Sequence, residues 1–301
     1  EISEEVGVLV VAGPEKPLSE EEQFALDQFI MRGKPLALLL DTYKVSSEDF
    51  MPKKMDHNME DFLKNYGVVL SSGLVMDTLN QRIAVETRQG YMLIRNVVNY
   101  PFFPVVHEFQ SDHPIVRELS RVTLPFVSPF IIHEKEGVQY TPLIKSSSKS
   151  WLKYGVYTLN PLQRIAPGPS APQGPFILAL VLQGKLESLF KEREEAIIQS
   201  PSQRMVMVGT SHFLKKDFLG DHASMVFLGN IIDWLLQEEG LIAIRSKGIE
   251  FRPLKEISRT RQLVFKYTNI FLMPLLFIFY GVFRWRARKK FMAEFNIEDL
   301  S

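Results

Sequence analysis

The sequence predicts an α/β protein, with a doubly wound parallel sheet followed by a transmembrane helix. Two observations predict the sheet: short continuous apolar runs, which are typical of strands buried on both faces, and helical patterns between them. A third predicts the membrane helix. Tyr267 to Phe283 is a run of seventeen uncharged, mostly apolar residues. A helix needs about 20 residues to cross a bilayer core, with a lower limit of about 17.

The first unit is predicted to be a strand followed by a helix. Val6–Val11 is apolar throughout and precedes a Gly-Pro pair, which favours a buried strand. Ser19 and Glu22 have the spacing of a capping box at a helix start. Gly33 is placed to end that helix. The predicted core face of the helix consists of Phe24, Ala25, Leu26, Phe29 and Ile30.

A second strand and a second helix follow. Pro35–Leu40 is the next apolar run, and Asp41 comes directly after it. A helix is expected over Asn58–Tyr66, with Gly67 at its end. Strands joined by helices in this way pair in parallel, which favours the doubly wound sheet.

The remainder of the body contains less regular signals. We expect strands at Gly73–Asp77, Pro125–His133, Val138–Ile144, Phe176–Leu182 and Met205–Val208, a short helix at Pro114–Ser120, a proline-rich loop at Pro167–Pro175 and an amphipathic helix at Ala223–Leu236.

The predicted domain organisation follows from the apolar run. Residues 1–255 form the body, 256–266 a juxtamembrane linker, 267–283 the span and 284–301 a short tail. Five cations lie just after the span, which favours a cytoplasmic tail and an extracytoplasmic body. They are Arg284, Arg286, Arg288, Lys289 and Lys290. A buried core helix or an interfacial helix is the alternative, and an N-terminal anchor upstream of Glu1 is also expected.

Composition excludes several classes of function. Lys and Arg number 35, as do Asp and Glu, so no nucleic-acid footprint is present. The chain has no cysteine, which removes disulfides, thiolate metal sites and cysteine nucleophiles. The histidines lack metal-binding spacing, and neither a Walker A sequence nor G-x-G-x-x-G occurs. We therefore expect no metal, no cofactor and no nucleotide.

Candidate binding residues follow the predicted strands, because ligands of open α/β sheets bind beyond the carboxyl ends of the strands. They are Asp41, Asp77, Ser211 and His212. The adjacent Ser and His allow a hydrolase hypothesis, but the G-x-S-x-G elbow is absent. A strand-to-helix turn with capping hydroxyls is the competing interpretation. No residue is predicted to be catalytic.

Two other polar segments have open interpretations. Arg245, Lys247 and Arg252 precede the predicted span, where they can dock on lipid or on a permease loop, or belong to a solvated linker. The segment Ser146–Trp151 is small, polar and basic. It could contact an anion or a sugar, or be an exposed turn.

Several motifs together resemble the GldG-type auxiliary proteins of ABC transporters, a group associated with bacterial gliding motility. The resemblance covers essentially the full chain. It rests on Leu9–Glu22, Ala25–Phe29, Asn58–Leu63, Gly73–Asp77, Ser146–Trp151, Ala179–Gly184 and Leu241–Leu254. Where many relatives have G-D-S-D-F, this chain has Gly209 to Phe213 with the sequence G-T-S-H-F, which lacks both acids.

The resemblance implies a fold and a set of partners. The body is expected to be similar to the domain shared by gliding and intraflagellar-transport proteins, with a flavodoxin-like or class I amidotransferase-like sandwich. An ABC permease and an ATPase are the implied partners. Amidotransferase activity needs a cysteine nucleophile, which this chain lacks.

The leading hypothesis is therefore a non-enzymatic auxiliary subunit of an ABC-type system in the inner membrane. Its body would bind cargo or a partner outside the cytoplasm, and its span would contact the permease and membrane lipid. One alternative is a glycan- or lipid-binding module that acts without a transporter, favoured by an exposed aromatic platform near Trp151 and Tyr154. The other is a serine hydrolase that uses Ser211 or His212.

Overall fold

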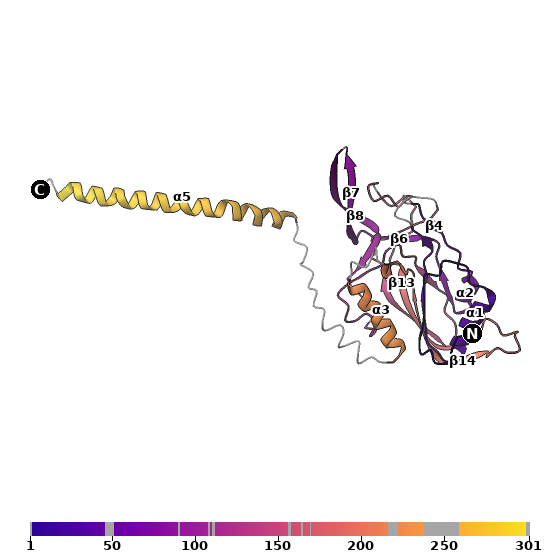
Figure 1. The fold of residues 1–301 in the computed structure, drawn as a ribbon. Helices are drawn as coiled ribbons and strands as arrows, with labels where there is room; N and C mark the ends of the chain where they lie inside the picture. Colours follow the sequence, from indigo (N-terminus) through magenta and orange to yellow (C-terminus); the bar gives the residue numbers. More distant parts are fainter. Residues whose placement is uncertain are drawn as a thin grey trace. The chain divides into compact units, whose positions relative to one another are not determined.

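The computed structural model describes residues 2–45, 51–89, 91–107, 109, 112–155, 158–163, 165–168, 170–215, 222–237 and 259–298. The chain divides into two compact units, Glu1–Phe251 and Arg252–Ser301 (Figure 1). The first unit contains the sheets and most of the helices. The second contains one long helix.

The central sheet of the first unit is mixed rather than parallel. Its strand order is β1-β2-β14-β13-β10-β5, with β11 also paired to β13. The strands are β1 (Leu9–Ala12), β2 (Leu36–Leu39), β5 (Val68–Leu70), β10 (Phe130–Ile132), β11 (Val138–Lys145), β13 (Ile177–Glu187) and β14 (Gln199–Val208).

Parallel pairing is confirmed only for β1, β2 and β14. The other pairs of the sheet are antiparallel, so the prediction of a parallel doubly wound sheet is wrong for β13, β10, β5 and β11. The reason is the connection between β13 and β14. It contains turns but no helix, and two successive strands joined without a crossover pair antiparallel.

Side chains of β2 alternate between two cores, as the pleat of a strand requires. Leu36, Leu38 and Leu40 join a core with residues of helices α1 and α2. Ala37 and Leu39 join a second core with residues of helix α3. Figure 1 shows α1 and α2 on one side of the sheet and α3 on the other, which gives three layers.

The helices confirm most of the predicted signals. Helix α1 is Glu20–Met31, and its capping box forms as expected: Ser19 Oγ accepts from the Glu22 N–H and the Glu22 carboxylate accepts from the Ser19 N–H. Helix α2 is shorter than predicted, at Glu60–Asn65. Helix α3 is His222–Leu235.

Three smaller sheets complete the first unit. They comprise β3 (Tyr43–Lys44) with β4 (Lys53–Lys54), β6 (Leu74–Met76) with β12 (Trp151–Lys153), and β7 (Asn80–Gln89), β8 (Met92–Val106) and β9 (Val122–Thr123). The predicted strand Gly73–Asp77 is therefore β6, which pairs with β12 rather than with the central sheet. An aromatic core that includes Tyr100, Phe102, Phe126 and Trp151 lies among these elements.

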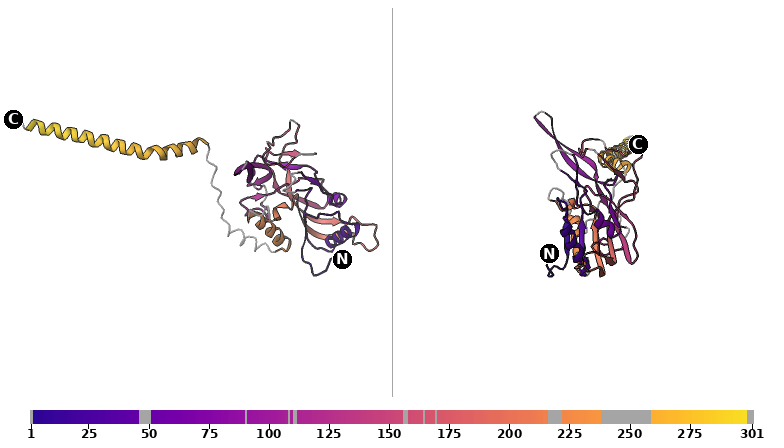
Figure 2. Two further views of the ribbon diagram at one scale, coloured as in Figure 1. Left: turned by 45° about the horizontal axis from the view of Figure 1, so that its top comes forward. Right: turned by 90° about the vertical axis from the view of Figure 1, so that its right-hand side faces the viewer.

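Other predictions for this region were wrong or incomplete. Pro114–Ser120 contains turns instead of a helix. Within Pro125–His133 only Phe130–Ile132 is a strand. The long β7–β8 hairpin was not predicted, because β7 lacks alternation of polar and apolar residues: Ile83, Ala84 and Val85 are consecutive apolar residues between polar ones. Figures 1 and 2 show this hairpin extending from the rest of the unit.

The second unit contains helix α5, Arg259–Glu298, which is 40 residues long. Its apolar part, Leu263–Arg286, has 24 residues and contains an 18-residue window with a mean hydropathy of 1.6. At 1.5 Å per residue that part is about 36 Å long, enough for a bilayer core of about 30 Å. It includes all of the predicted span 267–283, and the helix continues into the predicted tail.

Candidate functional site

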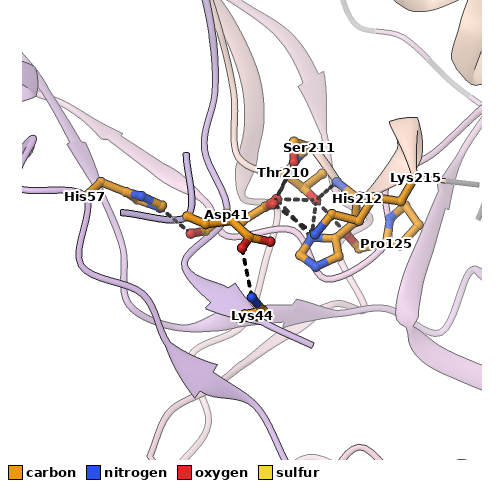
Figure 3. Close-up of polar contacts among 9 residues, drawn as sticks. Asp41, Lys44, His57, Pro125, Thr210, Ser211, His212 and Lys215 are labelled. Carbon is orange, nitrogen blue, oxygen red and sulfur yellow. Dashed lines mark hydrogen bonds and ion pairs between the residues drawn. The ribbon is translucent and has the colours of Figure 1, made fainter. Parts of the chain in front are cut away.

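Asp41 lies at the edge of the sheet where the three parallel strands end. It follows β2, Gly13 follows β1, and Thr210, Ser211 and His212 follow β14. Because parallel strands end at the same edge, residues from three distant parts of the chain meet there. Figure 3 shows Asp41 between His57 on one side and the Thr210–His212 turn on the other.

The Asp41 carboxylate accepts hydrogen bonds from that turn. Its Oδ1 accepts from the Ser211 N–H, from Thr210 Oγ1 at 3.3 Å and from His212 Nδ1 at 2.9 Å. Its Oδ2 accepts from Ser211 Oγ at 2.6 Å. Lys215 Nζ lies 3.7 Å from the same oxygen. The turn thus surrounds one carboxylate with donors, and Asp41 itself is only 1% exposed.

These contacts decide the protonation state of Asp41. Burial alone raises the pKa of a carboxyl group, but the hydrogen bond and charge of His212 and the two hydrogen bonds from Ser211 outweigh it. Together they lower the pKa of Asp41 to about 2. The group is therefore an anion at neutral pH.

Two glycines allow the strands to end so close together. A Cβ on Gly13, where φ is +54°, would lie 2.3 Å from Ser211 Oγ and 2.9 Å from Asp41 Oδ2. A Cβ on Gly209 would overlap the Ser128 carbonyl oxygen, which approaches to 1.8 Å. Both positions need glycine because another part of the chain occupies the space of a side chain.

This geometry does not support hydrolysis by Ser211. In a catalytic triad the serine donates to histidine, whereas here Ser211 and His212 both bond to Asp41. The two residues are 4% and 1% exposed, so no substrate reaches them in this conformation. The interpretation as a strand-to-helix turn agrees better with the structure, because Ser211 precedes a short 3-10 helix, His212–Leu214. The Ser211 hydroxyl, however, makes no capping hydrogen bond to that helix. The cluster of Asp41, Thr210, Ser211 and His212, here termed the Asp41 cluster, holds strand ends together.

Asp77 belongs to a different group. Its carboxylate accepts from the Ser147 N–H at 2.8 Å, from Ser147 Oγ at 2.6 Å and from the Leu79 N–H at 2.9 Å. It is 1% exposed. Two segments that the sequence analysis treated separately, Gly73–Asp77 and Ser146–Trp151, are therefore joined, and Asp77 fixes one to the other.

The interpretation of Ser146–Trp151 as an exposed turn is wrong for half of its residues. Ser146, Ser150 and Trp151 are buried. The Ser146 and Ser150 hydroxyls lie 2.7 Å apart, and Ser146 Oγ accepts from the Phe176 N–H. Because Trp151 is buried, it does not form an exposed aromatic platform with Tyr154.

The structure contains a groove next to Asp41 that was not predicted from the sequence. It has a volume of about 660 Å³ and is lined by residues from the end of β2, from β4, from α2 and from β5. His57 connects the groove to the Asp41 cluster, because its Nε2 donates to the Asp41 carbonyl oxygen. Its Nδ1 is then a buried acceptor without a hydrogen-bond partner among the described residues. The polar run Asp56-His57-Asn58 was the available signal.

The sequence profile of one protein family, described as "ABC-type uncharacterized transport system" and named as ABC transport auxiliary, matches residues 1–238. The chain belongs to this family. The match covers most of the first unit, including the Asp41 cluster, Asp77 and the groove. Of the remaining candidate residues, Arg245, Lys247 and Arg252 lie outside the described residues.

Two further comparisons concern this ABC transport auxiliary protein. A solved structure titled "mmIFT52 N-terminal domain" is similar at 13% identity, with 77% of each chain covered and a TM-score of 0.44. A comparison with curated proteins finds no match.

Proposed function

We propose that this protein is a non-enzymatic, membrane-anchored auxiliary subunit of an ABC-type transporter in the inner membrane. Helix α5 spans the membrane and packs against the permease, while the first unit lies outside the cytoplasm and binds cargo or a partner. An ABC ATPase completes the complex. A GldG-type role in gliding motility is part of this proposal, as is a flavodoxin-like or class I amidotransferase-like fold of the first unit, supported by the parallel strands β1, β2 and β14.

The family membership is the observation that carries the proposal. Helix α5 supports the anchor, because apolar side chains lie exposed along it, including Phe271, Leu275, Phe279 and Phe283. Exposed apolar side chains of this number are stable in lipid and unfavourable in water. The sealed Asp41 cluster supports a non-enzymatic role, because its polar groups bond to one another rather than to a substrate.

Purification tests the proposed partners. A tag on this chain should recover a polytopic permease and an ATPase from detergent-solubilised membranes. The matched variant carries lysine at Leu276 and Phe277, in the apolar part of α5, and should recover neither. Recovery of no transporter subunit with the unaltered chain would contradict the proposal.

Cysteine labelling tests the proposed topology. The chain has no natural cysteine, so Ser148→Cys in the first unit and Ala293→Cys beyond the apolar part of α5 each give one reporter. A maleimide that does not cross membranes should label Ser148→Cys in intact spheroplasts. It should label Ala293→Cys only after lysis. The reverse pattern would place the first unit in the cytoplasm.

The groove favours a second candidate function, the binding of a glycan. Lys54, Asp56, Glu60 and Lys64 line the groove with charged groups that bond to hydroxyls. Glycan-array binding that Ser72→Trp removes would favour this function, because Ser72 lines the groove. Ser148→Trp, on an exposed residue outside the groove, should leave binding unchanged. An array without signal would oppose it.

A further inference from the structure

The β7–β8 hairpin leaves one long strand edge unpaired. Among the described residues, β7 pairs with β8 alone, over the register from Asn80↔Pro104 to Gln89↔Met92. An antiparallel ladder turns the backbone N–H and C=O groups of every second residue away from the partner strand. The outer edge of β7, here termed the β7 edge, therefore presents unsatisfied donors and acceptors. Figures 1 and 2 show that the hairpin stands clear of the central sheet.

The hairpin also leaves apolar side chains uncovered. Leu93 and Val97 are 70% and 66% exposed on one of its faces. Ile83 and Val85 are only half-buried on the other face. Strand β9 pairs only with Val105 and Val106 at the base of β8, so the rest of the hairpin is two-stranded. A two-stranded ribbon is marginally stable in water, and further strands stabilise it. The hairpin is thus suited to receive a strand.

We infer that a second copy of this chain provides that strand, with the two β7 edges paired antiparallel about a two-fold axis at Ala84. Such pairing is isologous, because the same edge is used by both copies. It joins the sheets of the two copies into one, with the central strand order β8-β7-β7-β8. The inference is independent of the proposed transport function.

Charge selects the register of this pairing. Paired residues must lie on the same face, so the two-fold axis passes through a residue rather than between residues. With the axis at Ala84, Arg82 lies opposite Glu86 of the second copy, and the symmetry repeats that contact. An axis at Val85 would oppose Arg82 with Arg88, and an axis at Glu86 would oppose that carboxylate with itself. An axis at Thr87 would oppose Glu86 with Arg88, but it would pair only Val85–Gln89, whereas the axis at Ala84 pairs Asn80–Arg88. The Ala84 register is therefore the longest one that places opposite charges together.

The same register also pairs apolar residues on the other face of the sheet. Ile83 lies opposite Val85 of the second copy, again twice, and both are β-branched residues that favour such cross-strand pairs. Gln81 lies opposite Thr87. Charged and apolar residues therefore favour one alignment. The contact is small, so the association should be weak and dependent on protein concentration.

Cross-linking of the full chain in detergent tests the axis. Two Ala84 Cα atoms would lie about 4.5–5.5 Å apart, within the range of a disulfide. Ala84→Cys should therefore form disulfide dimers rapidly with copper–phenanthroline as the oxidant. Val97→Cys is the matched control, because Val97 pairs with Ala84 on β8 and would be three strand spacings, about 14 Å, from its copy.

A charge exchange tests the register. Arg82→Glu and Glu86→Arg should each weaken self-association at least tenfold in sedimentation velocity. A 1:1 mixture of the two variants should associate as strongly as the unaltered chain, because the glutamate introduced in one variant then faces the arginine introduced in the other. Helix α5 can also hold two copies together, but its contribution is equal in all of these proteins.

The overturning results are equally specific. The inference fails if Ala84→Cys cross-links no faster than Val97→Cys. It also fails if the mixture associates no better than the single variants while circular dichroism shows all of them folded. A different protein recovered on the β7 edge in place of a second copy would likewise refute it.

Discussion

Asp41 accepts several hydrogen bonds, through its side-chain carboxylate and through its backbone carbonyl oxygen. It accepts from Thr210, Ser211 and His212, and its carbonyl oxygen accepts from His57. A buried anion of this kind stabilises the fold only while its donors stay in place. Loss of the carboxylate would leave several of those donors unsatisfied within a closed environment.

Replacement of Asp41 by Asn should destabilise the first unit by roughly 3 kcal/mol at pH 7, because an amide has one acceptor oxygen for four donors. Urea unfolding of the full chain in detergent, followed by circular dichroism, measures the change. Ser211→Ala removes one donor and should cost about 1 kcal/mol. Equal stabilities of D41N and the unaltered protein would contradict the structural role.

The same residue predicts a pH dependence. The folded pKa of Asp41 is about 2, below its ordinary value, so its contribution to stability is complete above about pH 4. As the pH falls through the folded pKa, about 2 kcal/mol should be lost. The difference in stability between the unaltered protein and D41N should therefore shrink between pH 4 and pH 2. A constant difference across that window would show that Asp41 keeps an ordinary pKa.

Gly13 allows the close approach at the same site. Gly13→Ala should cost at least about 2 kcal/mol, because its Cβ would meet Ser211 Oγ at 2.3 Å. Gly137→Ala is the control: its φ is also positive, at +79°, but nothing lies within 4 Å of the added Cβ. It should cost about 1 kcal/mol from backbone strain alone. The midpoints of thermal unfolding of the two variants distinguish the cost of the steric overlap at Gly13 from the cost of the backbone conformation.

Helix α1 is fixed to its surroundings by a second buried carboxylate. Asp27 is fully buried and accepts from Tyr66 Oη at 2.7 Å, from Ser188 Oγ at 2.6 Å and from the Leu189 N–H at 3.0 Å. Its partners come from the end of α2 and from the segment after β13. Burial and the neighbouring Asp27 charge raise the pKa of Tyr66, so the phenol remains a donor.

Asp27→Asn should cost roughly 2 kcal/mol, because its amide nitrogen cannot accept from these donors, and Tyr66→Phe about 1 kcal/mol. The double variant should cost less than the sum, since the two residues share one hydrogen bond. Urea unfolding of all three proteins gives the coupling. Additive costs would mean that the Tyr66–Asp27 hydrogen bond contributes nothing.

Elements with local signals could be predicted from the sequence, whereas those that depend on distant pairing could not. A few neighbouring residues are enough to recognise the capping box at Ser19 and Glu22 and the apolar run of β2. The antiparallel pairing of β13 with β14 depends on the absence of a helix in the turns between them. For β7, Ile83, Ala84 and Val85 are consecutive apolar residues without polar–apolar alternation, so no local pattern indicates this half-exposed strand.

The candidate site follows the same rule. Strands β2 and β14 pair in parallel, so their carboxyl ends lie at the same edge of the sheet. Asp41, Ser211 and His212 follow those ends and therefore meet. The contact between Asp77 and Ser147 joins residues 70 positions apart through a small sheet, and no local pattern indicates it. The groove at His57 depends on the placement of α2 and β5, which the sequence does not specify.

At the scale of the whole molecule, we expect α5 to determine whether the chain is found in the membrane fraction. Lysine at both Leu276 and Phe277 should prevent stable insertion, because each charge near a helix centre costs about 3 kcal/mol in the bilayer. The variant should leave the membrane fraction on carbonate extraction, while Arg284→Lys should remain. Retention of the double-lysine variant would mean that α5 does not carry the anchor.

The two-sided alternation of β2 constrains how the length of this protein can change. Insertion of one residue within β2 would rotate each later side chain of the strand by half a turn, so leucines suited to α1 and α2 would face α3 instead. Both cores would then be mispacked at once. A gain or loss of residues in the segment that joins β13 to β14 has no such effect, so length variation is expected there.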